Sequence, residues 1–69
     1  MRISARNQIK GKIVDVKKGA TTAHVRIEVG SGLVITASIT NEAVDDLGLK
    51  TGAPASAIIK ASDILVAVD

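Results

Sequence analysis

Two short basic motifs near opposite ends of the chain each combine a cation with a hydroxyl. They are the N-terminal triplet Ser4-Ala5-Arg6 and the C-terminal triplet Lys60-Ala61-Ser62. Alternate side chains of an extended segment point to the same face, so each triplet presents its cation and its hydroxyl side by side. All four polar side chains donate hydrogen bonds, and two of them carry positive charge. We predict that the two triplets converge on one small, doubly charged oxyanion.

The composition limits how such a site is built. The chain has 69 residues, so we expect a single domain covering residues 1–69. Hydrophobic residues make up 46% of it, but it contains no Phe, Trp or Tyr, and the core must consist of smaller side chains. Ordering a chain costs about 1.5 kcal/mol per residue, which such a core struggles to offset. With no cysteine available for a disulfide or a thiolate metal site, we expect a stable homo-oligomer.

The sequence also limits location and partners. Its first residues lead into no apolar signal-peptide region, and no segment approaches the eighteen or so apolar residues of a membrane span. The absence of cysteine fits a reducing compartment. We therefore expect a cytoplasmic protein without a membrane partner. A net charge of +2 is too small to indicate a nucleic-acid surface.

The elements that position the N-terminal triplet are predicted to be strands. Alternating apolar and β-branched residues indicate strands at residues 8–16, 22–29 and 33–40. Gly11 lies inside the first of these and predicts a bulge or a sharp bend. Gly19 belongs to the following turn, where glycine is free to adopt a positive φ. Residues 30–32 read Gly-Ser-Gly and predict a hairpin.

The second half of the chain is predicted to add a helix and two strands. Thr40 or Asn41 caps a short helix that runs to Leu47, and Gly48 ends it. A strand at residues 55–60 and a corner at 61–63 lead to a fifth strand at 64–68, apolar throughout and expected to be buried on both faces. Five strands with a helix between the third and the fourth form an OB-fold-like barrel, so the predicted class is all-β.

Four segments together carry a family resemblance. They are Ile3-Ser4-Ala5-Arg6-Asn7-Gln8-Ile9-Lys10-Gly11, Lys18-Gly19-Ala20-Thr21-Thr22-Ala23, Leu47-Gly48-Leu49 with Gly52, and Ala57-Ile58-Ile59-Lys60-Ala61-Ser62. In these segments the chain resembles the molbindins, the small cytoplasmic molybdate-binding Mop proteins. The opening Ser-Ala-Arg-Asn-Gln combined with a late Lys-Ala-Ser is more specific than either piece alone. The resemblance covers essentially the entire chain.

The resemblance implies a function and an assembly. The expected assembly is a hexamer, a trimer of dimers, that binds molybdate or tungstate at subunit interfaces in order to store and buffer the oxyanion. Ser4, Ala5 and Arg6 of one subunit would meet Lys60, Ala61 and Ser62 of a neighbour at the main site. A second oxyanion site would involve Gly19, Ala20, Thr21 and Thr22. No cofactor and no metal-ion site are expected.

The chemistry of the ligand fits the residue types of the triplets. Molybdate at neutral pH is a tetrahedral dianion with four acceptor oxygens and no proton, so a good site supplies donors only. Arg6 offers five N–H groups and stays charged, while Lys60 supplies a compact point charge. The backbone amides at Ala5 and Ala61 can approach closely because a methyl group leaves room. Hydrogenphosphate would leave its hydroxyl facing donors only, and sulfate must be rejected by the size of the cavity.

The same residues also have interpretations that involve no ligand. Arg6 and Lys60 are also readable as solvated surface charges, and the two serines as turn residues. Strand alternation predicts that Asp63 faces away from Lys60. His24, the only histidine, lies on the polar face of the second strand and is expected to be exposed. Asp45 and Asp46 are consecutive on a helix, so their side chains diverge by about 100° and are expected to be solvated.

Two other function classes are open to an OB-like barrel. The alternative is a nucleic-acid-binding module, but such surfaces stack bases on aromatic rings, and this chain has none. An enzyme is not expected, because the chain has no cysteine, one histidine and no evident spacing of a nucleophile and a base.

Overall fold

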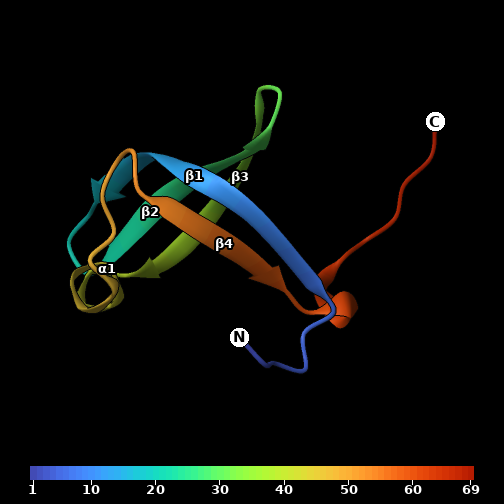
Figure 1. The fold of residues 1–69 in the computed structure, drawn as a ribbon, viewed down its shortest axis with the longest axis horizontal. Coiled ribbons are helices and arrows are strands. Elements are labelled where there is room, and N and C mark those ends of the chain that lie inside the picture. The colour runs from blue at the N-terminus through green and yellow to red at the C-terminus, as the bar shows by residue number, and fades with distance from the viewer.

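Four antiparallel strands make one sheet in the computed structural model, which describes residues 1–69 (Figure 1). The strands are β1 (Asn7–Lys18), β2 (Thr22–Gly30), β3 (Leu33–Thr40) and β4 (Pro54–Ile59), and the order in the sheet is β3-β2-β1-β4. A helix, α1 (Asn41–Leu47), joins β3 to the segment before β4, and a 3-10 turn, η1 (Ala61–Asp63), follows β4. The predicted order of three strands, a helix and a fourth strand is confirmed.

β1 is shared between two partners. Its first half, residues 7–12, pairs with β4, and its second half, residues 12–18, pairs with β2. The register shifts between Ile13 and Asp15, so the bulge lies there and the prediction of a bulge at Gly11 is wrong. Gly11 instead lets β1 and β2 approach closely. A Cβ added there would lie 2.8 Å from Cγ2 of Ile27 and against the carbonyl oxygen of Glu28.

The inner face of the sheet carries a thin aliphatic core. Six residues are buried: Ile13, Ala23, Val25, Ile27, Val44 and Ala57. Three of them alternate along β2, as the sequence pattern predicted, while the polar residues between them, His24 included, are exposed. The absence of aromatic side chains keeps this core small, so a single chain buries little apolar surface.

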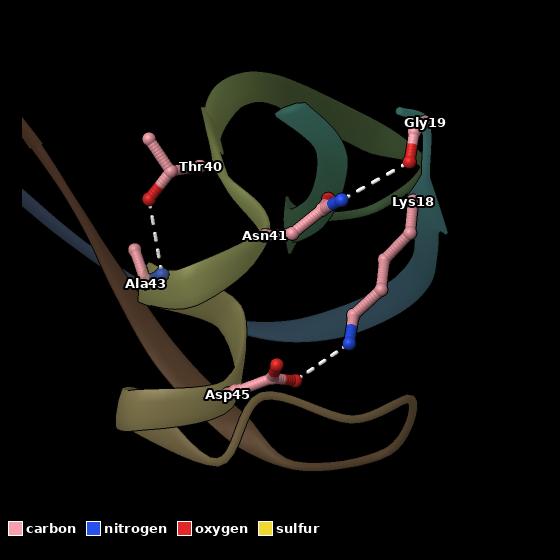
Figure 2. A network of polar contacts seen from close by, with 6 residues as sticks. All are labelled: Lys18, Gly19, Thr40, Asn41, Ala43 and Asp45. Atoms are coloured by element: carbon pink, nitrogen blue, oxygen red, sulfur yellow. Dashed lines mark hydrogen bonds and ion pairs between the residues drawn. The ribbon is translucent and has the colours of Figure 1, made fainter. Parts of the chain in front are cut away.

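The ends of α1 are formed by the predicted residues. Thr40 caps the helix, because its hydroxyl oxygen accepts a hydrogen bond from the Ala43 amide at 3.0 Å (Figure 2). Gly48 follows the helix with φ 63°, a left-handed conformation that favours glycine. Gly19, by contrast, does not have a positive φ, so the turn after β1 does not use the conformational freedom of glycine there.

Residues 64–68 do not form the predicted fifth strand in this chain. They leave η1 and run away from the sheet as an unpaired C-terminal tail (Figure 1). Leu65, Val66 and Val68 are 93%, 90% and 91% exposed, so the expectation of burial on both faces is wrong for the single chain. A strand needs a neighbouring edge, and the tail leads away from the free edges of β3 and β4. The sheet is accordingly not closed into a five-stranded barrel.

The helices of the chain are short. None of them has the length and apolar character that crossing a membrane requires.

Candidate functional site

The pairing of β1 with β4 brings the two triplets to one end of the sheet. The register runs from Lys12 opposite Pro54 to Asn7 opposite Ile59. The N-terminal triplet directly precedes Asn7, and the C-terminal triplet directly follows Ile59. Both therefore emerge from the same end of one strand pair, at the end of the sheet where β1 begins and η1 follows β4 (Figure 1).

Neither triplet is itself a strand. β1 begins only after the N-terminal triplet, and two of the C-terminal triplet's three residues belong to η1. The alternation argument for a shared face therefore does not apply to Lys60 and Ser62, nor does it decide where Asp63 points. The turn is held by the Asp63 amide, which donates to the Lys60 carbonyl at 2.9 Å, and by the Ile64 amide, which donates to the Ala61 carbonyl at 3.3 Å.

Two side-chain amides shape this end of the strand pair. Nδ2 of Asn7 donates to the carbonyl oxygen of Ile59 at 3.2 Å, and Nε2 of Gln8 donates to the carbonyl oxygen of Ala5 at 3.3 Å. Asn7 is half-buried and Gln8 is exposed. Asn7 thus links the end of β4 to the start of β1, and Gln8 links the N-terminal triplet to the start of β1.

Hydrogen-bond donors are left free around the triplets. The backbone amides of Ser4, Ala5 and Arg6 donate to no group in the chain, and the Lys60 amide has no acceptor either. The single ion pair of the structure joins Lys18 to Asp45, so the cations of both triplets lack a carboxylate partner. Their polar side chains are exposed, whereas Ala5 is half-buried. The arrangement is an open, cationic, donor-rich corner suited to an anion.

A second polar hollow lies at the other end of β1. It has a volume of about 300 Å³ and is lined by Lys17, Lys18, Gly19, Thr22 and His24. Of the residues predicted for a second oxyanion site, Gly19 and Thr22 line it, whereas Ala20 and Thr21 do not. Sequence reasoning missed Lys17 and His24, which face each other across β1 and β2. Only the register of the two strands reveals that pair.

Existing contacts already occupy part of this hollow. The Gly19 amide donates to the Thr22 carbonyl at 2.7 Å, and the Gly19 carbonyl accepts from Nδ2 of Asn41 at 3.0 Å. Nζ of Lys18 pairs with a carboxylate oxygen of Asp45 at 2.5 Å (Figure 2). Asp45 is exposed to solvent, as predicted, and it also pairs with one of the two lysines of the hollow.

An apolar groove lies on the inner side of the sheet. It has a volume of about 450 Å³, and 12 of its 14 lining residues are hydrophobic. The lining includes Ile35 and Ile39 of β3 and Ala55 and Ile59 of β4, the two edge strands. A groove with so few polar groups suits aliphatic side chains and not an anion.

Comparison with known proteins places the chain in a family. Residues 3–66 match the model of the TOBE domain. Molybdenum-pterin-binding protein 1 of Clostridium pasteurianum is 48% identical over 66 residues, which is 96% of this chain and 97% of that protein. The chain belongs to the molbindin family of TOBE-domain proteins. The resemblance carried by the two triplets and the glycine turns is thereby confirmed.

Solved structures share the fold of this family member. A molybdate-binding protein from Sporomusa ovata superposes with a TM-score of 0.92 at 31% identity, covering 99% of this chain and all of that one. ModG, described as a cytoplasmic molybdate-binding protein and solved with molybdate bound, gives a TM-score of 0.90 at 46% identity. That match covers 94% of this chain and 46% of ModG.

Proposed function

We propose that the chain binds molybdate or tungstate at the corner formed by the two triplets and thereby stores and buffers the oxyanion. The observation that carries the proposal is the β1–β4 register, which brings the segments that contain Arg6 and Lys60 to one end of the sheet, so this end of a subunit can offer either triplet to a neighbour. The names of its relatives support the choice of ligand, because they are described as binding molybdenum-pterin or molybdate. The proposed donors are Ser4, Ala5, Arg6, Lys60, Ala61 and Ser62.

The free donors fit a dianion energetically. At an effective dielectric constant of about 20, a cation about 4 Å from a unit charge gains about 4 kcal/mol, and a dianion gains about twice that. Desolvation offsets much of this gain. Two cations with several unpaired amides are therefore compatible with micromolar or tighter affinity, about −8 kcal/mol. The corner offers no acceptor side chain within either triplet other than the serine hydroxyls, so a protonated anion is disfavoured.

We further propose that the protein works as a homo-oligomer. A tail with three apolar residues at least 90% exposed is costly in water, and the groove between β3 and β4 is apolar and open. In the proposed assembly the tail of one subunit fills the groove of another and supplies the fifth strand of its barrel. The hexamer implied by the family resemblance, a trimer of dimers, provides such neighbours.

The tail connects the assembly to the site. The C-terminal triplet directly precedes residues 64–68, so a tail that crosses to a neighbour carries the triplet to the subunit boundary. The proposed site thus lies at an interface, with the two triplets of each site contributed by adjoining subunits. The single chain by itself leaves this corner exposed, and a neighbour would enclose the ion.

The remaining expectations follow from the same findings. We propose a cytoplasmic location, as described for ModG, and a binding role without catalysis or cofactor. Nucleic-acid binding is not proposed, because the chain has no aromatic ring for base stacking. A second, weaker oxyanion site is proposed in the hollow at Gly19 and Thr22, beside the loop that includes Ala20 and Thr21.

Isothermal titration of the assembled protein tests the function. Molybdate and tungstate are expected to bind with micromolar or tighter affinity, sulfate and phosphate at least 10-fold more weakly. Sedimentation analysis of the same sample gives the oligomeric state. Equal affinity for all four anions would contradict a selective site, and a monomeric mass at micromolar concentration would contradict the assembly.

A further inference from the structure

Two side chains outside the proposed ligand set control the direction of two free backbone amides. A trans peptide unit is planar, with its C=O and its N–H pointing in opposite directions, and the chain has no cis peptide bond. A hydrogen bond that holds the carbonyl therefore also sets the direction of the amide in the same peptide unit. Asn7 holds the carbonyl of the Ile59–Lys60 unit, and Gln8 holds that of the Ala5–Arg6 unit.

The amides on the far side of these units belong to the two key residues. They are the N–H of Lys60 and the N–H of Arg6, and neither has an acceptor in the chain. Each triplet thus has one free amide whose peptide unit is tied down at its carbonyl. The β1–β4 ladder ends at the pair of Asn7 and Ile59, so the Arg6 and Lys60 amides lie beyond its last rung.

We propose that Asn7 and Gln8 are positioning residues that pre-orient the Lys60 and Arg6 amides as donors to the oxyanion. The inference rests on the proposed function. Fixing these two peptide units before binding removes an ordering cost that the ligand otherwise bears, and it turns both carbonyl oxygens, which repel an anion, away from the donors. Neither Asn7 nor Gln8 needs to contact the ion.

Fixing one residue's backbone is worth roughly a 5- to 30-fold change in an equilibrium constant. Asn7→Ala and Gln8→Ala are therefore each expected to weaken molybdate binding by about 5- to 30-fold, as measured by isothermal titration. Asn7→Leu, which keeps the shape but removes the donor, is expected to match Asn7→Ala. The control is Thr40→Ala, which removes a hydrogen bond of similar length at the cap of α1 and is expected to leave molybdate affinity within about twofold.

Amide NMR of the same proteins separates positioning from general weakening. On addition of molybdate, the Arg6 and Lys60 amide resonances of the wild type are expected to shift strongly. Asn7→Ala is expected to alter the Lys60 response and spare Arg6, and Gln8→Ala the reverse.

The titration and the NMR experiment together distinguish the positioning role from the proposed function. Wild-type affinity in both alanine variants, or amides of Arg6 and Lys60 that do not respond to bound molybdate, overturns the positioning role while leaving the proposed function intact. Absence of molybdate binding to the wild type overturns the function and the inference together. Gln8 is exposed, so its variant keeps the test decisive even where the half-buried Asn7 proves necessary for folding.

Discussion

The side-chain amide of Asn7 donates a hydrogen bond to the carbonyl oxygen of Ile59 at 3.2 Å and closes the β1–β4 ladder. Fifty-two positions separate the two residues in the chain, yet each stands next to one of the basic triplets. This contact marks the point at which two distant pieces of sequence become one corner of the molecule. The proposed chemistry depends on that corner.

Removing either cation of the corner is expected to abolish most oxyanion binding. Arg6→Ala and Lys60→Ala each lose hydrogen bonds to a charged partner, worth about 1.5–3 kcal/mol, so molybdate affinity should fall at least about 10-fold. Ser62→Ala loses a weaker, neutral hydrogen bond and should lower molybdate affinity about 5-fold. Isothermal titration measures all three. Arg26→Ala, an exposed arginine on β2, is the matched control, and wild-type affinity in both charge variants would remove the site.

Releasing Lys18 from its ion pair is expected to strengthen the proposed second site. Asp45 holds Nζ of Lys18 at 2.5 Å, so Asp45→Asn frees a cation beside the hollow and removes a nearby negative charge. Weak molybdate binding, measured in an Arg6→Ala background, should tighten by a few fold. The pair is exposed, so the stability cost should stay below about 1 kcal/mol.

Asp46→Asn controls for that experiment. It changes the net charge equally on the adjacent residue, which has no ion-pair partner. If both variants tighten binding to the same extent, overall charge is responsible and the local release of Lys18 is not.

A charge in the C-terminal tail is expected to break the assembly. Leu65 is 93% exposed in the single chain, and in the proposed oligomer it enters an apolar groove, where a carboxylate is strongly disfavoured. Leu65→Asp should therefore shift the sedimentation profile towards smaller species and weaken molybdate binding. Leu33→Asp, at a hairpin position that is 63% exposed, should leave the assembly unchanged. An unchanged oligomer in Leu65→Asp would argue that the tail stays free.

A methyl group at Gly11 is expected to destabilise the fold. The added Cβ would press on Cγ2 of Ile27 at 2.8 Å and on the carbonyl of Glu28. Overpacking of this kind costs about 1–3 kcal/mol, so Gly11→Ala should lower the denaturation midpoint. Ser31→Ala, in the exposed hairpin, is the comparison. A midpoint equal to that of the wild type would show that β1 and β2 separate readily at this point.

Local sequence signals predicted most of the secondary structure. Alternation along β2 placed its buried and exposed faces correctly, because a strand repeats every two residues. The sequence placed the start of α1 at Thr40 or Asn41 and its end at Gly48. A capping side chain bonds an amide within the first turn, and glycine readily adopts the left-handed conformation that ends a helix. Such preferences depend on neighbours in the chain, so no three-dimensional information was needed to recognise them.

Contacts between distant residues decided the rest. The sequence alone indicated a bulge or a sharp bend at Gly11, but the register shift lies between Ile13 and Asp15. At Gly11 the carbonyl oxygen of Glu28 leaves no room for a Cβ, and only the packing of β1 against β2 shows this. The facing pair of Lys17 and His24 likewise appears only when the strands are aligned.

The tail and the two triplets show the division most clearly. The apolar character of residues 64–68 is legible in the sequence, but whether they pair depends on an edge strand, and none lies beside them in this chain. The residue types of the triplets indicated an anion, whereas the β1–β4 register is what brings both triplets to one end of the sheet. Composition determines which ligand chemistry is available, and tertiary structure decides which residues share it, because distance in space is set by pairing between segments far apart in the chain.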